Sequence, residues 1–261
     1  GMEGAYGQAA MKTYFGEDCN SYSVRTFRDA MEAIEEGAAD YAVLPIENST
    51  AGAVNEVYDL LVEFENYIVG EVIIPITHTL AGLPGTQLSE LKRVYSKAEA
   101  LMQTTRFLEE HSDWQQISVA NTAIAAKKIL DDQDRTQAAV CSAYAAKVYG
   151  LEVLEDNIND ESGNCTRFII VTNQKVFLKG AKKISICFEV PHESGSLYHL
   201  LSHFIYNDLN MSKIESRPIE GRSWEYRFFV DFEGNLEEPG VKNALRGLRE
   251  ESRSLKILGN Y

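Results

Sequence analysis

The sequence predicts an α/β fold with two domains, the second of which has a ferredoxin-like order of elements. Strand and helix patterns alternate along the first part of the chain, and this alternation is typical of a largely parallel sheet covered by helices on both faces. Near residues 179–182 the pattern changes to strand–helix–strand–strand–helix–strand, which is the ferredoxin-like order. The length of 261 residues is consistent with two domains.

The elements of the first domain begin with a strand at residues 39–46, which is mostly apolar and is closed by the polar run from Glu47 to Thr50. Beyond Gly52, apolar residues recur with the period of one helix face and predict a helix. The later elements alternate, with strands at 67–74, 93–95, 117–119, 137–141 and 167–171 and helices at 98–110, 121–130 and 142–148. We expect this domain to cover residues 1–178.

The elements of the second domain follow a linker near residue 180. They are a strand at 184–190, a helix at 197–205, strands at 212–219 and 224–231, a helix around 241–248 and a strand at 255–258. We expect this domain to cover residues 182–261.

Charge and composition restrict the classes of function. The net charge is −14 and nearly all of it falls before residue 182, which disfavours binding to nucleic acid and to anionic membranes. No run of about 18 apolar residues could span a membrane, and the first residues do not resemble a secretory signal. The four cysteines are scattered, as expected in a reducing compartment. These features predict a cytoplasmic protein that acts on a small molecule.

Strong catalytic and cofactor motifs are not found. The sequence has no G-x-G-x-x-G, P-loop, G-x-S-x-G or H-E-x-x-H pattern. His199 and His203 have metal-ligand spacing on a predicted helix, but no carboxylate is suitably placed, so surface or interface histidines are favoured. His78 and His111 have no visible partner. We therefore predict no metal and no cofactor.

Three polar clusters lie where predicted strands meet loops. The first is residues 47–52, at the carboxyl end of a strand and the start of a helix, where α/β sheets bind ligands and exposed N–H groups attract carboxylates. The second pairs Ser96 with Gln103, and the third is residues 164–168. Taken singly, each has an ordinary explanation, which is helix capping for the first two and a β-branched strand start for the third.

Taken together, the three clusters resemble the signature motifs of one enzyme family, the prephenate dehydratases. The resemblance rests on residues 45–50 (PIENST), on Tyr95 and Ser96 with Gln103, and on residues 166–168 (TRF). The second domain resembles the regulatory ACT domain that is appended to these enzymes.

The resemblance implies both a fold and an activity for the first domain. The fold is that of a type II periplasmic binding protein, with one lobe at 1–75 and 157–178, another at 76–156, and substrate bound between them. The activity is a carbon–oxygen lyase reaction of phenylalanine biosynthesis, which converts prephenate to phenylpyruvate, carbon dioxide and water. By the same resemblance Thr166 is the proton donor; because its hydroxyl is a weak acid, we expect it to donate a strong hydrogen bond and to relay a proton.

Further residues are assigned by the same resemblance. Glu47 either shares a proton with the substrate or orients its loop, and we favour the second role. Arg167 is either a nearby cation for the substrate or a structural residue. The predicted catalytic residues are Thr166, Glu47, Asn48 and Gln103, and the predicted substrate-binding residues are Ser49, Thr50, Ser96, Arg167 and Phe168.

Residues 193–197 and 215–218 resemble the phenylalanine-binding segments of ACT domains. Gly195 either lets a ligand approach the backbone closely or eases the turn from strand to helix. We expect feedback by L-phenylalanine on a homodimer or homotetramer that forms through this domain. The predicted effector-binding residues are Gly195, Ser196, Leu197, Glu215, Ser216, Arg217 and Pro218.

Two other functions remain open. An arogenate dehydratase shares the fold and the motifs, and a non-catalytic amino-acid sensor shares the two-lobed architecture, although a sensor needs a cation and a carboxylate for its ligand. The chain departs from the family at Ala5 and Lys97, which are often Ser and His, and it starts at Gly1 without the usual apolar strand. This start is consistent with a missing upstream strand or with a piece of a bifunctional chorismate mutase/prephenate dehydratase.

Overall fold

The structure is a computed structural model that describes residues 2–261, so Gly1 lies outside the described residues. The chain divides into two compact units. Unit 1 comprises residues 1–26, 47–52 and 72–168, and unit 2 comprises residues 27–46, 53–71 and 169–261. These units do not coincide with the predicted domains, whose boundaries stay a prediction.

Unit 1 contains a five-stranded sheet in the order β6-β5-β7-β4-β8. β5 (Arg93–Ser96) runs parallel to β6 (Gln115–Ser118) and β7 (Gln137–Cys141), whereas β4 (Thr79–Gly82) runs antiparallel to β7 and to β8 (Glu152–Glu155). The sheet is therefore mixed, because β4 runs antiparallel to both of its neighbours. Neither β4 nor β8 was predicted from the sequence. The helices of this unit are α1 (Tyr6–Phe15), η1 (Leu88–Glu90), α4 (Ala98–Met102), α5 (Thr105–Glu109), α6 (Thr122–Asp132) and α7 (Ala143–Val148).

The prediction of one helix over residues 98–110 is wrong, because two short helices, α4 and α5, take its place. The Asp160 carboxylate accepts the backbone N–H groups of Thr105 and Arg106 and so caps α5. The Gln103 carbonyl accepts the N–H of Asp160. A residue distant in the sequence therefore stabilises the break and places Gln103 at the end of α4 instead of on the face of a continuous helix.

Unit 2 contains helices α2 (Phe27–Glu35) and α3 (Asn55–Glu63). The eight-stranded sheet has the order β11-β12-β10-β13-β3-β9-β1-β2. Four of its strands have residues in both units: β1 (Ala42–Asn48), β2 (Gly52–Ala53), β3 (Tyr67–Pro75) and β9 (Cys165–Thr172). The elements wholly within unit 2 are β10 (Lys183–Glu189), α8 (Ser196–Tyr206), β11 (Met211–Pro218), β12 (Tyr226–Glu233), α9 (Pro239–Glu251) and β13 (Ser254–Asn260).

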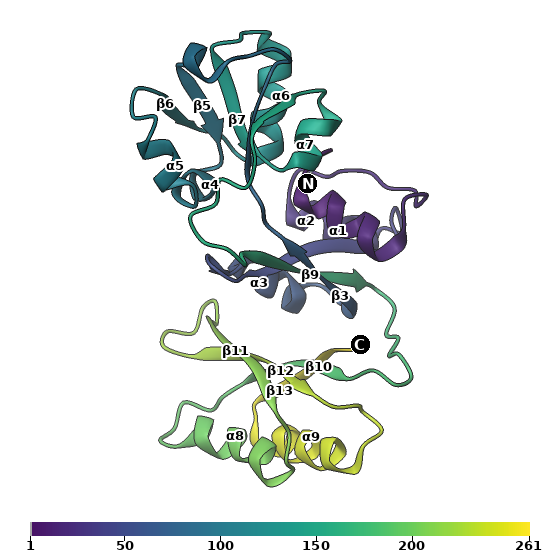
Figure 1. Ribbon diagram of the computed structural model, residues 1–261. Coiled ribbons are helices and arrows are strands. Elements are labelled where there is room, and N and C mark those ends of the chain that lie inside the picture. The colour runs from purple at the N-terminus through teal and green to yellow at the C-terminus, as the bar shows by residue number, and fades with distance from the viewer. Residues whose placement is uncertain (1) are drawn as a thin grey trace. The chain divides into compact units, whose positions relative to one another are not determined.

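The last six elements confirm the predicted strand–helix–strand–strand–helix–strand order. Their strands pair antiparallel in the order β11-β12-β10-β13, and α8 and α9 lie side by side on one face of them (Figure 1). Phe204 of α8 and Leu245 of α9 are buried with Phe188 and Phe232 of the strands. Burial of these large apolar side chains is the main stabilisation of this part of the chain.

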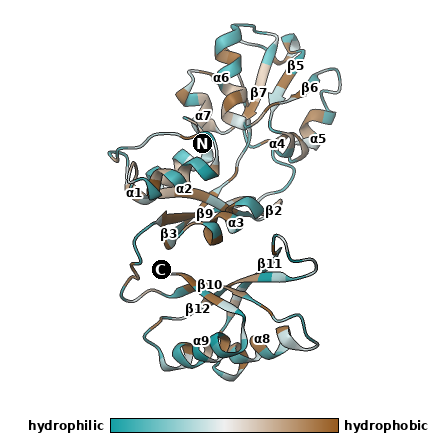
Figure 2. Ribbon diagram, turned by 180° about the vertical axis from the view of Figure 1, so that it is seen from behind, coloured by the Kyte–Doolittle hydropathy of each residue, from teal (hydrophilic) through white to brown (hydrophobic). Residues whose placement is uncertain are grey.

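Beyond β13 the eight-stranded sheet continues with two apolar strands. β3, which pairs with β13, and β9, which follows β3, are mostly hydrophobic (Figure 2), as is typical of buried strands. A Cβ atom at Gly259 of β13 would overlap the backbone carbonyl of Ile68 in β3, so glycine is needed where these strands pair. Tyr58 of α3 packs edge to face on Phe229 of β12, with ring centroids 4.8 Å apart. None of the helices described is both long and apolar enough to cross a membrane.

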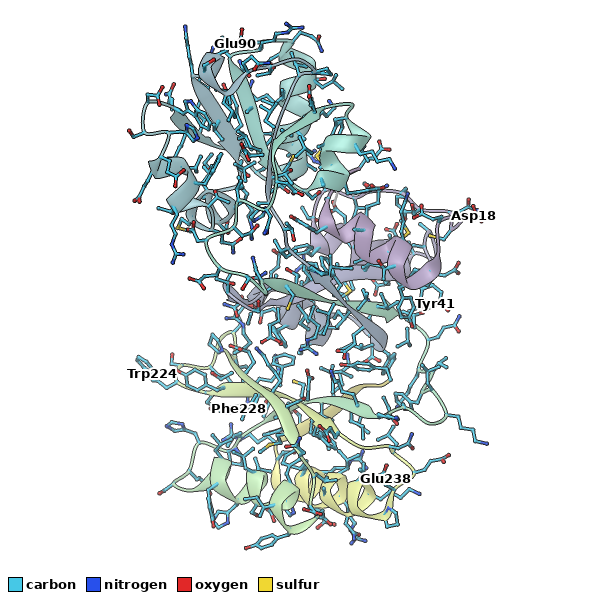
Figure 3. The ribbon with its side chains drawn as sticks, in the orientation of Figure 1. Asp18, Tyr41, Glu90, Trp224, Phe228 and Glu238 are labelled. Atoms are coloured by element: carbon cyan, nitrogen blue, oxygen red, sulfur yellow. The ribbon has the colours of Figure 1, made fainter. Side chains whose placement is uncertain are left out.

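The loop between β11 and β12 carries an exposed tryptophan at its tip. Trp224 is 77% exposed and projects from the ribbon (Figure 3). Its φ of 65° is uncommon for a bulky residue. Contacts elsewhere in the loop must therefore stabilise this backbone conformation.

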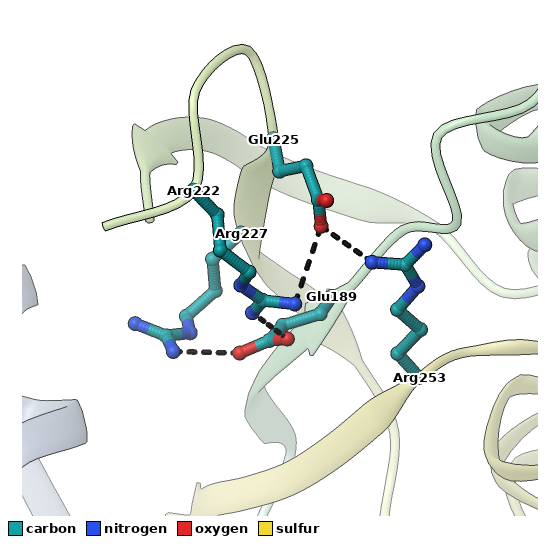
Figure 4. Close-up of polar contacts among 5 residues, drawn as sticks. All are labelled: Glu189, Arg222, Glu225, Arg227 and Arg253. Atoms are coloured by element: carbon teal, nitrogen blue, oxygen red, sulfur yellow. Dashed lines mark hydrogen bonds and ion pairs between the residues drawn. The ribbon is translucent and has the colours of Figure 1, made fainter. Parts of the chain in front are cut away.

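An ion-pair cluster secures the base of that loop (Figure 4). The Glu189 carboxylate, at the end of β10, accepts hydrogen bonds from Arg222 and Arg227. Glu225 accepts hydrogen bonds from Arg222 at 3.2 Å and from Arg253 at 2.5 Å. Burial alone would raise the pKa of Glu189, but the hydrogen bonds from the two arginines outweigh burial and lower it. The cluster therefore joins the loop to the ends of β10 and β13 through ionised groups.

Candidate active site

The candidate active site is a cluster of amide and hydroxyl side chains in unit 1. Asn48 is the last residue of β1, and Thr166 is the second residue of the neighbouring strand β9. Asn48 Nδ2 donates to Thr166 Oγ1 at 2.9 Å, to Asn164 Oδ1 at 2.9 Å and to the Cys165 carbonyl at 3.1 Å. Asn164 and Thr166 are buried. Strand pairing thus joins polar side chains that are more than a hundred residues apart in the sequence.

The backbone sets the direction of these hydrogen bonds. The N–H groups of Thr50 and Ala51 donate to Asn48 Oδ1 at 3.0 and 2.8 Å, and a backbone N–H can only donate. Asn48 therefore presents its Nδ2 to Thr166. Because Thr166 Oγ1 accepts from Asn48, its own proton remains for another acceptor, and the described part of the chain offers none.

The same direction of donation continues to Gln103. Asn164 accepts at Oδ1, so its Nδ2 donates to Gln103 Oε1 at 3.1 Å. Ser49 supports this assignment independently, since its hydroxyl accepts the N–H of Cys165 at 3.0 Å and lies 3.4 Å from Asn164 Oδ1, to which it donates. Gln103 Oε1 is thus an acceptor, and the two N–H groups of Gln103 Nε2 have no partner among residues 2–261.

His78 contacts the other side of the Gln103 carbonyl. It lies directly before β4, is only 2% exposed, and has Nε2 at 3.0 Å from Gln103 Oε1. Since Oε1 is an acceptor, Nε2 is the protonated nitrogen, and Nδ1 is left 3.4 Å from the Tyr6 hydroxyl. Burial lowers the pKa of His78, and the hydrogen bond to Gln103 offsets this only in part. The imidazole is therefore neutral at pH 7.

The cluster consequently offers hydrogen-bond donors and carries no charge. The outward donors are the Thr166 hydroxyl and the Gln103 amide, while Asn48, Asn164 and His78 hold them in place. Such donors bind carboxylate oxygens and stabilise charge that develops on a departing oxygen. The site can therefore hold an anionic substrate and assist the loss of a hydroxyl group.

The remaining serine and threonine residues predicted at the site are placed differently. Ser49 and Thr50 are exposed, and both belong to the turn that orients Asn48. Ser96 is fully buried, and its hydroxyl donates to the Val140 carbonyl at 2.6 Å. The structure therefore does not bring Ser96 into the cluster, because its proton is used to join β5 to β7.

Glu47 and Arg167 form an ion pair away from the cluster. Their side chains approach to 3.4 Å, and they directly neighbour Asn48 and Thr166 in the two strands. Successive side chains of a strand point to opposite faces, so this pair lies on the face opposite the amide cluster. Phe168 shares the face of Thr166 and is 3% exposed.

The residues predicted to bind phenylalanine lie at two places in unit 2. Gly195 precedes α8 with φ of 83°, a conformation that favours glycine. Ser196 and Leu197, the first residues of α8, are half-buried. Residues 215–218 lie in β11, which is the edge strand of the sheet.

Within β11, Arg217 makes a bidentate ion pair with α3. Its Nε and Nη2 donate to the two carboxylate oxygens of Asp59 at 3.0 and 2.7 Å. Glu215 instead lies 3.5 Å from Lys213. The predicted effector segment is therefore joined to a helix that begins seven residues after Asn48 in the chain.

His199 and His203, the two histidines of α8, were considered above as metal ligands, and His203 contacts α9. His203 Nε2 lies 3.2 Å from a Glu251 carboxylate oxygen, and the ring packs against Gly247 of α9. In residues 2–261 there is no group of three or more His, Cys, Asp or Glu side chains that could hold a metal ion.

Three residues of the cluster were not predicted from the sequence. Asn164 belongs to the polar segment before β9, and its position two residues before Thr166 was the signal that could have identified it. His78 was expected to have no partner, and Tyr6 was given no role. Neither carries a local signal, because His78 meets Gln103 only through the fold.

Comparison with known proteins shows the family of the chain. The family model for prephenate dehydratase matches residues 1–176. The chain is 39% identical to a bifunctional chorismate mutase/prephenate dehydratase of Aquifex aeolicus, over 97% of this chain and 69% of that one. It is 37% identical to arogenate dehydratase/prephenate dehydratase 6, chloroplastic, of Arabidopsis thaliana, over 100% of this chain and 67% of that one.

Two solved structures have closely similar folds. A prephenate dehydratase from Arthrobacter aurescens in complex with L-Phe has a TM-score of 0.92 and 31% identity, over 99% of this chain and 87% of that one. A structure described as GqqA, a novel type of quorum quenching acylase, has a TM-score of 0.91 and 31% identity, over 99% of this chain and 94% of that one.

The family match, the relatives and the shared mixed α/β fold place the protein in the class of lyases. The chain belongs to the prephenate dehydratase family. Its reaction is the dehydration and decarboxylation of prephenate in phenylalanine biosynthesis.

Proposed function

We propose that prephenate binds at the cluster of Asn48, Gln103, Asn164 and Thr166 and that Thr166 acts on the leaving hydroxyl. The observation that carries this proposal is the hydrogen bond from Asn48 to Thr166 Oγ1. It makes the threonine oxygen an acceptor within the protein, so that its proton can be donated only outward. Glu47 and Arg167 then support the two strands, and Ser49 and Thr50 support the turn.

The reaction requires a donor at this position. The bond between the ring carbon and its hydroxyl breaks, and the oxygen takes up one proton and leaves as water. The bond from the ring to its carboxylate also breaks, which releases carbon dioxide, and the electron pair of that bond completes the aromatic ring. A threonine hydroxyl is a weak acid, so Thr166 donates a hydrogen bond that strengthens as charge develops, while water supplies the net proton.

Substrate choice between prephenate and arogenate tests the proposal. Arogenate carries an ammonium group where prephenate carries a keto oxygen. The outward amide of Gln103 is a donor that suits the keto oxygen, whereas an ammonium needs an acceptor. We expect kcat/KM for prephenate to exceed that for arogenate by about 10-fold or more, as measured by ultraviolet assays of phenylpyruvate and phenylalanine formation.

Arogenate is the second candidate substrate because several relatives bear that name, with 36–37% identity. Faster turnover of arogenate than of prephenate would reverse the assignment of substrate, and no turnover of either would refute the lyase reaction at this site.

An acylase reaction is not favoured by the cluster. A serine or threonine nucleophile needs a base within hydrogen-bond reach. In the described chain, the Thr166 hydroxyl meets the amide of Asn48, and the Ser49 hydroxyl meets the amide of Asn164. His78 donates to Gln103 rather than accepting from a hydroxyl.

For the second domain we propose an ACT-like regulatory role with L-phenylalanine as the effector. The ferredoxin-like order of elements, the positive φ of Gly195 and the L-Phe complex of the Arthrobacter aurescens relative support it. The ion pair of Arg217 with Asp59 provides a contact through which binding at β11 can act on α3.

We expect phenylalanine to bind the intact protein in calorimetry and to lower its activity. Arg217→Ala should weaken this binding by about 10-fold, the usual effect of losing a hydrogen bond to a charged group. Arg246→Ala is the matched control, since Arg246 lies on the exposed face of α9 and donates a hydrogen bond to Asn243 of the same helix. Absence of phenylalanine binding, or equal effects of the two substitutions, would contradict the proposed regulation.

Four further properties remain proposals. They are the division into a catalytic domain at 1–178 and an ACT domain at 182–261, the two catalytic lobes, a homodimer or homotetramer formed through the second domain, and a cytoplasmic location.

A further inference from the structure

The orientation of the Gln103 amide decides whether the site attracts or repels a carboxylate. An amide turned by 180° has nearly the same shape but exchanges its donor and acceptor sides. In the observed orientation Gln103 presents two N–H donors outward. In the reversed orientation it would present Oε1, an acceptor, to an anionic substrate.

Two donors oppose that reversal. Asn164 Nδ2 and His78 Nε2 reach Gln103 Oε1 at 3.1 and 3.0 Å. If Gln103 turned over, its Nε2 would face both, and three donors would meet with no acceptor. Asn164 is held by Asn48 and Ser49, so the remaining requirement is that His78 carries its proton on Nε2.

We propose that His78 is a positioning residue that holds Gln103 in its substrate-binding orientation through the Nε2–H tautomer. The inference rests on the proposed function, because it concerns the residue that Gln103 presents to prephenate. His78 itself is buried and touches Gln103 rather than the substrate.

The surroundings of His78 favour this tautomer. Its backbone N–H donates to Asn159 Oδ1 at 2.6 Å, which fixes the position of the residue. Nδ1 faces the Tyr6 hydroxyl, whose proton is directed at the Thr77 carbonyl at 2.8 Å. The ring edge of Tyr6 also packs on the imidazole, with centroids 6.2 Å apart. Nε2 is thus the ring nitrogen with a well-placed acceptor, and a proton there makes the shorter hydrogen bond.

Two substitutions of His78 by an amide residue differ in how far the side-chain nitrogen reaches toward Gln103. In His78→Gln the amide nitrogen is as far along the side chain as Nε2 and can donate to Gln103. In His78→Asn the amide nitrogen corresponds in position to Nδ1 and does not reach Gln103 Oε1. We expect His78→Asn to raise KM for prephenate by about 10-fold with kcat within about threefold, since a ground-state contact is weakened. His78→Gln should restore KM to near the parent value.

A purely structural role gives a different result. Partial unfolding reduces the amount of active enzyme, so it lowers apparent kcat and leaves KM unchanged. That pattern in His78→Asn, or equal KM values for the two variants, would overturn the inference while leaving the dehydratase function intact.

Nitrogen-15 NMR of the imidazole provides a readout that does not depend on turnover. In the parent protein we expect a protonated Nε2 and an unprotonated Nδ1 for His78, assigned by the loss of its signals in His78→Gln. The opposite tautomer would overturn the inference whether or not prephenate is converted.

Discussion

Thr166→Ala is expected to lower kcat for prephenate by about 100- to 1,000-fold, the usual effect of removing one hydrogen-bond donor to developing charge. KM should change little, because the lost interaction strengthens only as the hydroxyl leaves. Folding should be preserved, since Asn48 Nδ2 retains the Asn164 and Cys165 oxygens as acceptors. Steady-state kinetics with prephenate, together with thermal unfolding, measure both effects.

Thr166→Ser is the matched control because it keeps the hydroxyl and removes only the methyl group. We expect it to retain kcat within about 10-fold of the parent, since the donor survives with more rotational freedom. If Thr166→Ala kept kcat within a few-fold of the parent, Thr166 would not be the donor. Equal losses in both variants would point to packing by the methyl group instead.

Asn164→Asp is expected to reduce kcat/KM by about 100-fold or more, because it adds a charge where the substrate is an anion. One oxygen of the new carboxylate can still accept from Asn48. The other would face Gln103 Oε1, which in the parent protein accepts from Asn164 at 3.1 Å. Two acceptors at that distance repel, so Gln103 should turn over and present its oxygen to the substrate. Protonation removes the added charge, so the variant's activity relative to the parent should rise as the pH falls.

Asn243→Asp adds the same charge on the exposed face of α9 and serves as the control. We expect its kcat/KM to stay within about twofold of the parent, because the new charge is exposed to solvent, lies next to Arg246 and is screened by salt. A similar loss in both variants would mean that net charge, rather than the direction of the amide hydrogen bonds, limits binding.

The elements of this protein were largely predictable because they depend on local patterns. The apolar runs and helical periods predicted β1, α3, β3 and every element from β10 onward, and their order indicated the ferredoxin-like arrangement. The break between α4 and α5 was not predictable, since it depends on capping by Asp160. β4 and β8 were missed because short strands carry little periodicity.

Some residues of the site were predictable from the sequence, but their arrangement was not. Asn48, Gln103 and Thr166 were named from the sequence and do meet, whereas Ser96 is turned into the sheet and Glu47 pairs with Arg167 on the opposite face. Whether two polar residues share a face depends on strand pairing over long separations, which a local pattern does not contain.

The sequence by itself determined most of the strands and helices and their order, the acidic net charge of the chain and the family to which the chain belongs. The tertiary structure alone decided the direction of donation from Thr50 and Ala51 through Asn48 to Gln103 and His78. The physical reason is that an amide or imidazole can present either a donor or an acceptor. The orientation of each group is fixed only when the fold places backbone N–H groups, which cannot accept a hydrogen bond, next to the first amide of the series.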